Sequence, residues 1–377
     1  MRILLIILMV TMTTIGLSSL DKLSETTGYD YENSAIIRST NSGSSWSTCN
    51  SGTQRWLLGV DYRKQTSTAL AVGEKGTVLR TANDGVGWTS LSSGTYETLN
   101  DIAYCGQTNT AIAVGNNGKV IVTQNNGSSW SHPSNVTTCQ LNSIAFQGAT
   151  STAVAVGSNG TIIRTTNSGL SWTIISSGTS SDLYGVAFCG QTSNVVAVGG
   201  NGLILRSFTG GTSWNSISSP TSYTLRDIAF RGQTDYATAV GLNGTIISTL
   251  NGGSSWLDES SPINTHLLSV DYQYAVNTRV AVGSRGQVIN SINGGSWHIR
   301  QSGTDYDLHS VSFRGQTAYV LAVGKNDRQC IPISLVQDTE HFEQTIISFD
   351  LASCVLSAYV NESVIARAQL FDIAGRL

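Results

Sequence analysis

The chain has 377 residues and a formal net charge of −3; only 12% of its residues are charged, whereas 39 are glycine and 4 are proline. This length suits one large repeat fold or two ordinary domains. A chain low in charge and rich in glycine is typical of a sheet protein with many tight turns rather than of a disordered one. The net charge gives no reason to expect binding to nucleic acid or to an acidic membrane.

The N-terminus has the pattern of a signal peptide, which we predict over residues 1–19. Arg2 supplies a positive charge, residues 3–10 form an apolar core, and residues 16–19 include small residues that suit cleavage. The alternative is a short membrane anchor, but the apolar run is well below the roughly 20 residues that span a bilayer. We therefore expect an exported protein, in the extracellular space, the cell envelope or a lumen, that is not an integral membrane protein. Residues 20–33 would then be a linker.

A repeat with a period of 42 residues runs through residues 34–324. Seven of the eight tryptophans follow it, at intervals of 42 residues five times and 41 once. They are Trp46, Trp88, Trp130, Trp172, Trp214, Trp256 and Trp297. A Val-Gly pair and a leucine recur with the same spacing, and these three seven-fold series together predict seven structural units.

One unit has the pattern of four short strands separated by turns. In residues 141–172, Asn159-Gly160 is a strong hairpin signal because a type I′ turn needs positive φ at both central positions. Four antiparallel strands in a repeat of roughly 42 residues make one propeller blade. Residues 308–324 hold only the first half of a unit, and residues 35–46 only the second half. The predicted fold is therefore all-β: a seven-bladed β-propeller of four-stranded antiparallel blades with a split closing blade.

The segment before each tryptophan follows the pattern Ser/Thr-x-Asn-x-Gly-x-Ser-Trp, with some departures. The residues that recur in it include Asn41, Gly43, Asn167, Asn251 and, in a copy one residue shorter, Asn293. The segment resembles the Asp-box, or bacterial neuraminidase repeat, with Asn in place of Asp; both side chains can cap a turn. The longer consensus, clearest in residues 225–256, resembles the photosystem II assembly/stability factor family of propellers. This resemblance covers about residues 34–324 and implies a non-catalytic scaffold that binds or assembles proteins.

An enzyme is the alternative, because Asp-box propellers include sialidases. A sialidase-like site needs three converging arginines, a tyrosine activated by a glutamate, and an acid/base carboxylate. Tyr96 and Glu97 are chain neighbours, which is the wrong relation for such a pair, and no His or Cys cluster has metal-ligand spacing. We predict no catalytic residue, no metal and no cofactor, and keep a glycan-binding or glycan-hydrolysing propeller as the second hypothesis.

A binding site is expected where the repeats differ from one another. The position just after the first-strand aromatic residue carries Arg231, Gln273, Arg314 and Arg63, which fall on consecutive blades because unit seven adjoins unit one. We predict that these four residues, the rim arc, form a basic and polar surface for an acidic protein loop or an anionic glycan. The alternative is a turn position that tolerates arginine. A protein is the expected partner, and a monomer is the expected state.

Other charged residues of the repeats have structural interpretations. Arginines that precede the tryptophan motif are expected to cover the blade edge with their aliphatic stems: Arg38, Arg80, Arg164 and Arg206. Asp61 and Asp271 stand where four other units have alanine, which predicts carboxylates bonded to backbone amides between blades. Asp101 and Asp227 likewise replace Gly or Ser.

Residues 325–377 lack the repeat. Their last segment alternates like strands and ends in a sequence that resembles the Asp-x-x-Gly-Arg of type IX secretion sorting domains. We predict either a truncated sorting domain or a small strand-rich extension. Six cysteines in an exported chain suggest disulfides, but only Cys330 and Cys354 are placed so that a bridge is conceivable.

Overall fold

The computed structural model describes residues 34–274, 276–325, 345–350, 355–360 and 363–369. Strands β1 to β27 belong to one compact unit, Glu32–Asp327. The remaining strands form a separate three-stranded antiparallel sheet: β28 (Thr345–Asp350), β29 (Val355–Val360) and β30 (Ser363–Gln369). The predicted signal peptide, the linker and the Cys330–Cys354 pair lie outside the described residues. No helix among the described residues has the length and apolar character to cross a membrane.

The compact unit consists of seven antiparallel sheets, one for each predicted blade. Blades one to three contain β3 (Leu57–Tyr62), β4 (Ala69–Gly73), β5 (Val78–Thr81) and β6 (Thr89–Leu91); β7 (Leu99–Tyr104), β8 (Ala111–Gly115) and β9 (Val120–Thr123); and β10 (Leu141–Phe146), β11 (Ala153–Gly157), β12 (Ile162–Thr165) and β13 (Thr173–Ile175). Blades four and five contain β14 (Leu183–Phe188), β15 (Val195–Gly199), β16 (Ile204–Ser207) and β17 (Asn215–Ile217); and β18 (Leu225–Phe230), β19 (Ala237–Gly241), β20 (Ile246–Thr249) and β21 (Leu257–Asp258). Blade six contains β22 (Leu267–Gln273), β23 (Thr278–Gly283), β24 (Val288–Ser291) and β25 (Trp297–Arg300).

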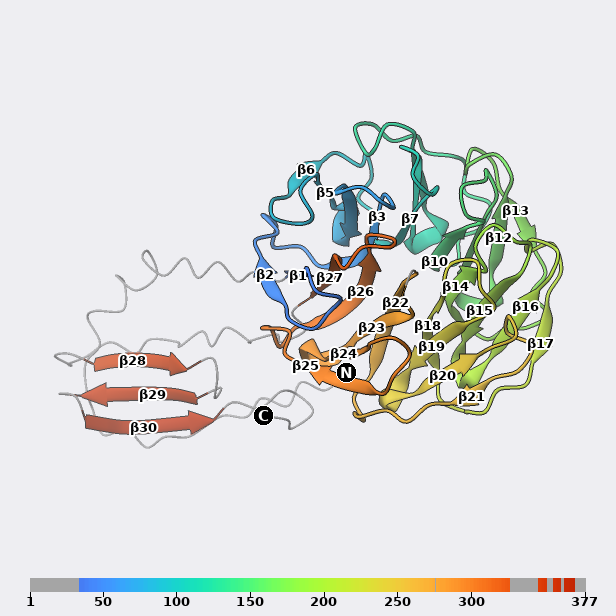
Figure 1. Cartoon of the computed structure of the whole chain (residues 1–377). Coiled ribbons are helices and arrows are strands. Elements are labelled where there is room, and N and C mark those ends of the chain that lie inside the picture. Colours follow the sequence, from blue (N-terminus) through green and yellow to red (C-terminus); the bar gives the residue numbers. More distant parts are fainter. Residues whose placement is uncertain (1–33, 275, 326–344, 351–354, 361–362, 370–377) are drawn as a thin grey trace. The chain divides into compact units, whose positions relative to one another are not determined.

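The closing blade is built from both ends of the repeat region. It contains β26 (Asp307–Phe313), β27 (Val320–Lys325), β1 (Ser34–Ser39) and β2 (Ser47–Cys49). β1 pairs with β27 along its whole length, from Ser34 opposite Lys325 to Ser39 opposite Val320. Figure 1 shows the blue N-terminal strands beside the orange C-terminal ones in this blade. The predicted seven-bladed propeller with a split closing blade is confirmed.

The first strand of each blade lies at the centre of the ring. Each packs against the first strands of both neighbouring blades, and the series closes where β26 meets β3. The second strands are buried throughout, as in β11, because neighbouring blades cover both faces. On the first strand, the large apolar side chains are buried, with Val60 3% and Tyr62 0% exposed.

The hairpin between the second and third strands has the predicted turn. Asn159 (φ 56°, ψ 35°) and Gly160 (φ 66°) occupy its centre, and Thr161 N donates to Ser158 O at 3.1 Å. Both central residues have positive φ, which defines a type I′ turn. The same single turn recurs in six blades as η2 (Glu74–Gly76), η3 (Asn116–Gly118), η4 (Ser158–Gly160), η5 (Gly200–Gly202), η6 (Leu242–Gly244) and η7 (Ser284–Gly286).

Blade two departs from the predicted four strands. Its outer edge pairs only through an isolated bridge between Val122 and Ser131. The other blades continue the outer strand for two or more residues, but here Pro133 follows two positions later. Proline has no backbone N–H to donate to the ladder, so the fourth strand ends after one pair.

Candidate functional site

The rim arc lies on the end of the ring where the first strand turns into the second. Two of its members contact the turn before the outer strand of the next blade. Gln273 accepts a hydrogen bond from Ser42 Oγ at 2.7 Å, and Arg314 forms an ion pair with Asp84 at 3.1 Å. Ser42 and Asp84 occupy the same place in the tryptophan motifs of two different blades. The rim arc therefore connects adjacent blades as well as lining one rim.

The four residues of the rim arc differ in whether their polar groups are free to bind a partner. Gln273 is 7% exposed and also donates to Gln316 O at 3.2 Å, and the charge of Arg314 is balanced by Asp84. Arg63 donates to the neutral side chain of Asn109. Arg231 has a ring contact with Tyr236 at 5.8 Å and, within the described part of the chain, no hydrogen bond or carboxylate for its guanidinium. Arg63 and Arg231 thus keep an unbalanced positive charge on this rim, and their role in binding stays a prediction.

The turn in the tryptophan motif is held by its own side chains. Asn167 Oδ1 accepts from Thr165 Oγ1 at 2.8 Å and from Ser171 N at 3.0 Å. Trp172 Nε1 donates to Gly169 O at 3.0 Å. Gly169 has φ +87°, and a Cβ there would lie 2.7 Å from the Ile112 side chain of the preceding blade. The motif therefore requires glycine both for its turn and for close blade packing.

The arginines that precede the tryptophan motif make more contacts than predicted. The guanidinium groups, and not only the aliphatic stems, reach the motif turn of the next blade. Arg164 Nε donates to Gly210 O at 2.7 Å, and Arg80 Nη1 donates to Asn126 O at 3.1 Å. The carbonyl oxygens of a turn are acceptors without strand partners, so a neighbouring arginine is a suitable donor.

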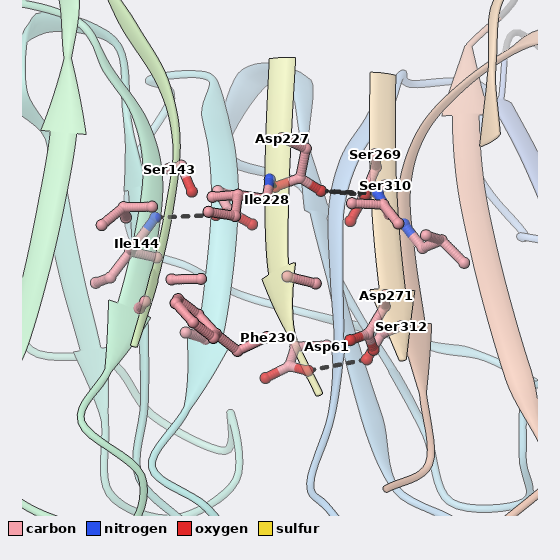
Figure 2. Close-up of a pocket in the computed structure, with 18 of the residues that line it drawn as sticks. Asp61, Ser143, Ile144, Asp227, Ile228, Phe230, Ser269, Asp271, Ser310 and Ser312 are labelled. Carbon is pink, nitrogen blue, oxygen red and sulfur yellow. Dashed lines mark hydrogen bonds between the residues drawn. The ribbon is translucent and has the colours of Figure 1, made fainter. Parts of the chain in front are cut away.

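A cavity of 1320 Å³ follows the ring axis and is lined by the first strands and their turns. Asp101 and Asp227 lie in one layer of its wall, and Asp61 and Asp271 lie in another. Asp227 points toward Ser269 of the next blade, and Asp61 toward Ser312 (Figure 2). The cavity wall thus carries four carboxylates, all of which the sequence singled out as departures from the repeat.

Each of these carboxylates accepts a hydrogen bond from a backbone N–H of the next blade, as predicted for Asp61 and Asp271. The donors and distances are Tyr104 N to Asp61 at 2.9 Å, Ile144 N to Asp101 at 2.9 Å, Val270 N to Asp227 at 3.0 Å and Phe313 N to Asp271 at 2.8 Å. Serines make the same bond elsewhere: Ser310 Oγ accepts from Val60 N at 3.1 Å. These side chains join the central strands of blades that have no backbone ladder between them.

The junction around the closing blade holds a cluster that the sequence did not predict. Lys64 Nζ lies 3.0 Å from Asp61 and 3.9 Å from Asp271, and 5.8 Å from the centre of the Tyr274 ring. Lys64 and Tyr274 replace the glycine found at this turn position in the five other blades. The missed signal is that these departures fall on blades one and six, which flank the closing blade.

Burial changes the ionisation of the cavity carboxylates. It raises the pKa of Asp101 to about 7 and that of Asp227 to about 6, against the backbone hydrogen bonds that favour the charged forms. The pKa of Asp271 is also raised by burial, although Lys64 opposes the shift. The same burial raises the pKa of Tyr274 to about 12.

We expect the double substitution Asp101→Ser and Asp227→Ser to flatten the pH dependence of stability. A raised carboxyl pKa adds stability that is complete below the ordinary value of 3.8 and is lost as the pH rises through about 6 to 7. Serine keeps an acceptor for the next blade, as Ser310 does, but cannot titrate. Chemical denaturation at pH 5 and pH 8 measures the free energy of unfolding; the wild-type protein should lose stability between them, and the variant should lose much less. An equal loss in both proteins would contradict this assignment.

A second unpredicted cluster joins blade six to the end of blade five. Arg279 Nη1 and Nη2 lie 2.7 and 2.8 Å from the two carboxylate oxygens of Glu259, and Trp297 Nε1 donates to the same carboxylate at 2.8 Å. Arg279 is 7% exposed and stands where other blades have alanine or valine. The motif of this blade is one residue shorter, so Trp297 uses Glu259 as its acceptor where Trp172 uses a motif carbonyl. The sequence signal was the arginine in a buried strand position.

Tyr96 and Glu97, the chain neighbours weighed against a sialidase-like pair, lie apart from the cavity carboxylates in their contacts. Tyr96 is 89% exposed, and Glu97 accepts from Asn117 Nδ2 at 3.0 Å. Within the described ranges, no group of three or more His, Cys, Asp or Glu side chains could hold a metal ion. Cys49, Cys105, Cys139 and Cys189 are free thiols.

Comparison with known proteins gives similarity in structure only. No protein-family model and no curated protein match the chain. A solved structure of YCF48 bound to D1 peptide is similar, with a TM-score of 0.57 and 18% identity over 79% of this chain and 96% of that chain. The chain has the fold of YCF48. YCF48 from Cyanidioschyzon merolae agrees, with a TM-score of 0.55 and 18% identity over 72% of this chain and 95% of that one.

Proposed function

We propose that this chain is an exported, non-catalytic propeller that binds a protein segment on the rim that carries the rim arc. The observation that carries the proposal is the pair of arginines, Arg63 and Arg231, whose charge on that rim is balanced by no carboxylate of the residues that the structure describes. Guanidinium groups recognise carboxylates through paired hydrogen bonds. The similar YCF48 structure contains a bound D1 peptide, which supports a peptide segment as the kind of ligand this fold accommodates.

The proposal includes the nature of the repeats. We infer that the tryptophan motifs are Asp-boxes in which asparagine replaces aspartate, because Asn167 Oδ1 accepts the turn hydrogen bonds that an aspartate would accept. This inference and the similarity in fold support a general design like that of photosystem II assembly/stability factors. Export is inferred from the N-terminal pattern alone, and a monomer is the proposed state.

A non-catalytic role is supported by how the carboxylates are used. Asp61, Asp101, Asp227 and Asp271 all accept backbone hydrogen bonds between blades. An acid/base residue must instead face the substrate within hydrogen-bond reach. The second candidate function, a glycan-binding or glycan-hydrolysing propeller, is favoured by no such observation.

The substitutions Arg63→Ala, Arg231→Ala and Arg314→Ala, made together, test the rim. Wild-type protein is used to select binders from a displayed library of random 12-residue peptides, and the affinity of each selected peptide is measured by fluorescence polarisation. We expect the triple variant to bind at least about tenfold more weakly, because each guanidinium contact with a carboxylate contributes on the order of 1 kcal/mol or more.

The matched control removes three positive charges from the opposite rim. Lys75→Asn and Arg285→Asn restore the asparagine that other blades have at the turn position with positive φ, and Lys119→Thr restores the threonine that follows the turn in other blades. This control should bind like the wild-type protein. A library that yields no binder, or equal affinity for both variants, would contradict the proposed function.

A further inference from the structure

Three consecutive blades expose a large apolar side chain at the same place on the rim. The second position of the tryptophan motif is Phe208 in blade four, Leu250 in blade five and Ile292 in blade six, and these side chains are 61%, 61% and 37% exposed. The other four blades have small or polar residues there: Thr40, Ala82, Gln124 and Thr166. We call Phe208, Leu250 and Ile292 the apolar row. Exposed apolar groups gathered on one part of a surface mark a binding site more often than scattered ones do.

A buried arginine holds the aromatic ring at one end of the apolar row. Arg206 is 5% exposed, and its guanidinium carbon lies 3.9 Å from the centre of the Phe208 ring. Arg206 is itself fixed by Asn194 Oδ1 at 2.9 Å and by Ser254 of the next blade. The ring therefore stacks on a buried cation that also reaches the blade carrying Leu250. An anchor fixed before binding loses less conformational entropy when a partner is bound.

A positive charge borders the apolar row. Arg231, on blade five, lies against Tyr236, which is 41% exposed. Gln147 occupies the equivalent position in blade three and lies beside the motif turn of blade four, 3.8 Å from where a Cβ on Gly210 would be. By this equivalence, the position of Arg231 is next to the motif turn of the following blade. For Arg231 the next blade is the one that carries Ile292. The row thus combines aliphatic and aromatic anchors with a guanidinium that no carboxylate of the described residues balances.

We propose that the apolar row is the docking surface for the peptide segment, which lies across blades four to six with apolar side chains on the row and a carboxylate at Arg231. The proposal rests on the proposed function and narrows it to one sector of the rim. Charge complementarity at Arg231 selects an acidic apolar peptide. An anionic membrane would instead require a cluster of exposed Lys and Arg, whereas Arg206 is buried and Asp235 lies close enough to affect its pKa.

The test uses the full chain with Phe208→Thr, Leu250→Thr and Ile292→Thr combined. Threonine is the residue at this position in two other blades, so the fold accepts it. The control, Val86→Ser and Leu170→Ser, removes two side chains that are 61% and 53% exposed at another motif position on blades one and three, where other blades have serine. Peptides selected on the wild-type protein are measured on all three proteins. We expect the row variant to bind at least about tenfold more weakly and the control to bind normally.

The outcomes separate this inference from the proposed function. If peptides selected on the wild-type protein lose affinity in the Arg63/Arg231/Arg314 variant but not in the row variant, the function stands and the apolar row is not the docking surface. If no peptide is selected, both fail. Vesicles of phosphatidylcholine and phosphatidylglycerol provide the last arm: binding by the wild-type protein that the row variant loses, without any peptide binding, would show a lipid surface instead and overturn the proposal.

Discussion

Removal of residues 34–49 is expected to abolish the cooperative unfolding of the propeller. These residues supply β1 and β2, the two outer strands of the closing blade. Without them β27 loses its ladder partner along six residue pairs, and the buried side chains of Leu321 and Val323 lose the cover of Ile36. Burial of one isoleucine contributes about 1.5–3 kcal/mol, and a whole domain is stable by only about 5–15 kcal/mol. Near-ultraviolet circular dichroism and guanidinium titration measure the loss.

A circular permutant distinguishes loss of the closing blade from a general effect of moving the chain ends. Lys325 and Ser34 are opposite each other on paired strands, so a short Gly-Ser linker can join them. New ends can be opened between Ser222 and Tyr223, which are both exposed. This protein keeps all seven blades and should unfold cooperatively. If the truncated protein is as stable as the permutant, the closing blade does not hold the ring together.

Glu259→Ala is expected to lower the free energy of unfolding by about 3–5 kcal/mol, because it leaves a buried charge without its partner. Arg279, which is 7% exposed in the wild-type protein, would then keep Thr238 Oγ1, at 2.7 Å, as its hydroxyl acceptor. Trp297 Nε1 would lose its acceptor as well. Although burial opposes ionisation, Arg279 holds the pKa of Glu259 below its ordinary value, so the stabilisation from the pair should be lost as the pH falls below about 4.5.

The double substitution Glu259→Ala and Arg279→Ala is the control for this pair. Alanine is the residue at the Arg279 position in blades one, two, three and five, and the double variant buries no unpaired charge. It should be more stable than Glu259→Ala alone, which guanidinium denaturation of the wild-type, single and double variants would show. Additive losses of stability would mean that the two side chains do not interact as a pair.

The repeat pattern was sufficient to predict the architecture and part of the site. The interval between tryptophans determined the number of blades, the two half-units determined the split closing blade, and Asn-Gly determined the type I′ turns, because all three depend on residues close together in the chain. The same alignment identified the cavity carboxylates and the rim arc as departures from the repeat. It could not show that Arg314 faces Asp84 while Arg231 faces no carboxylate in the described part of the chain.

Contacts between blades were decided by the tertiary structure alone. Lys64 meets Asp271 across the closing junction, Arg279 of blade six meets Glu259 at the end of the outer strand of blade five, and Phe208 stacks on Arg206 beside the blade of Leu250. The partners in the first two pairs belong to different blades, and which way each side chain points depends on packing between sheets. A repeat aligned to itself shows which positions are equivalent. The ring determines which of them touch, and therefore where charge and apolar surface remain free for a partner.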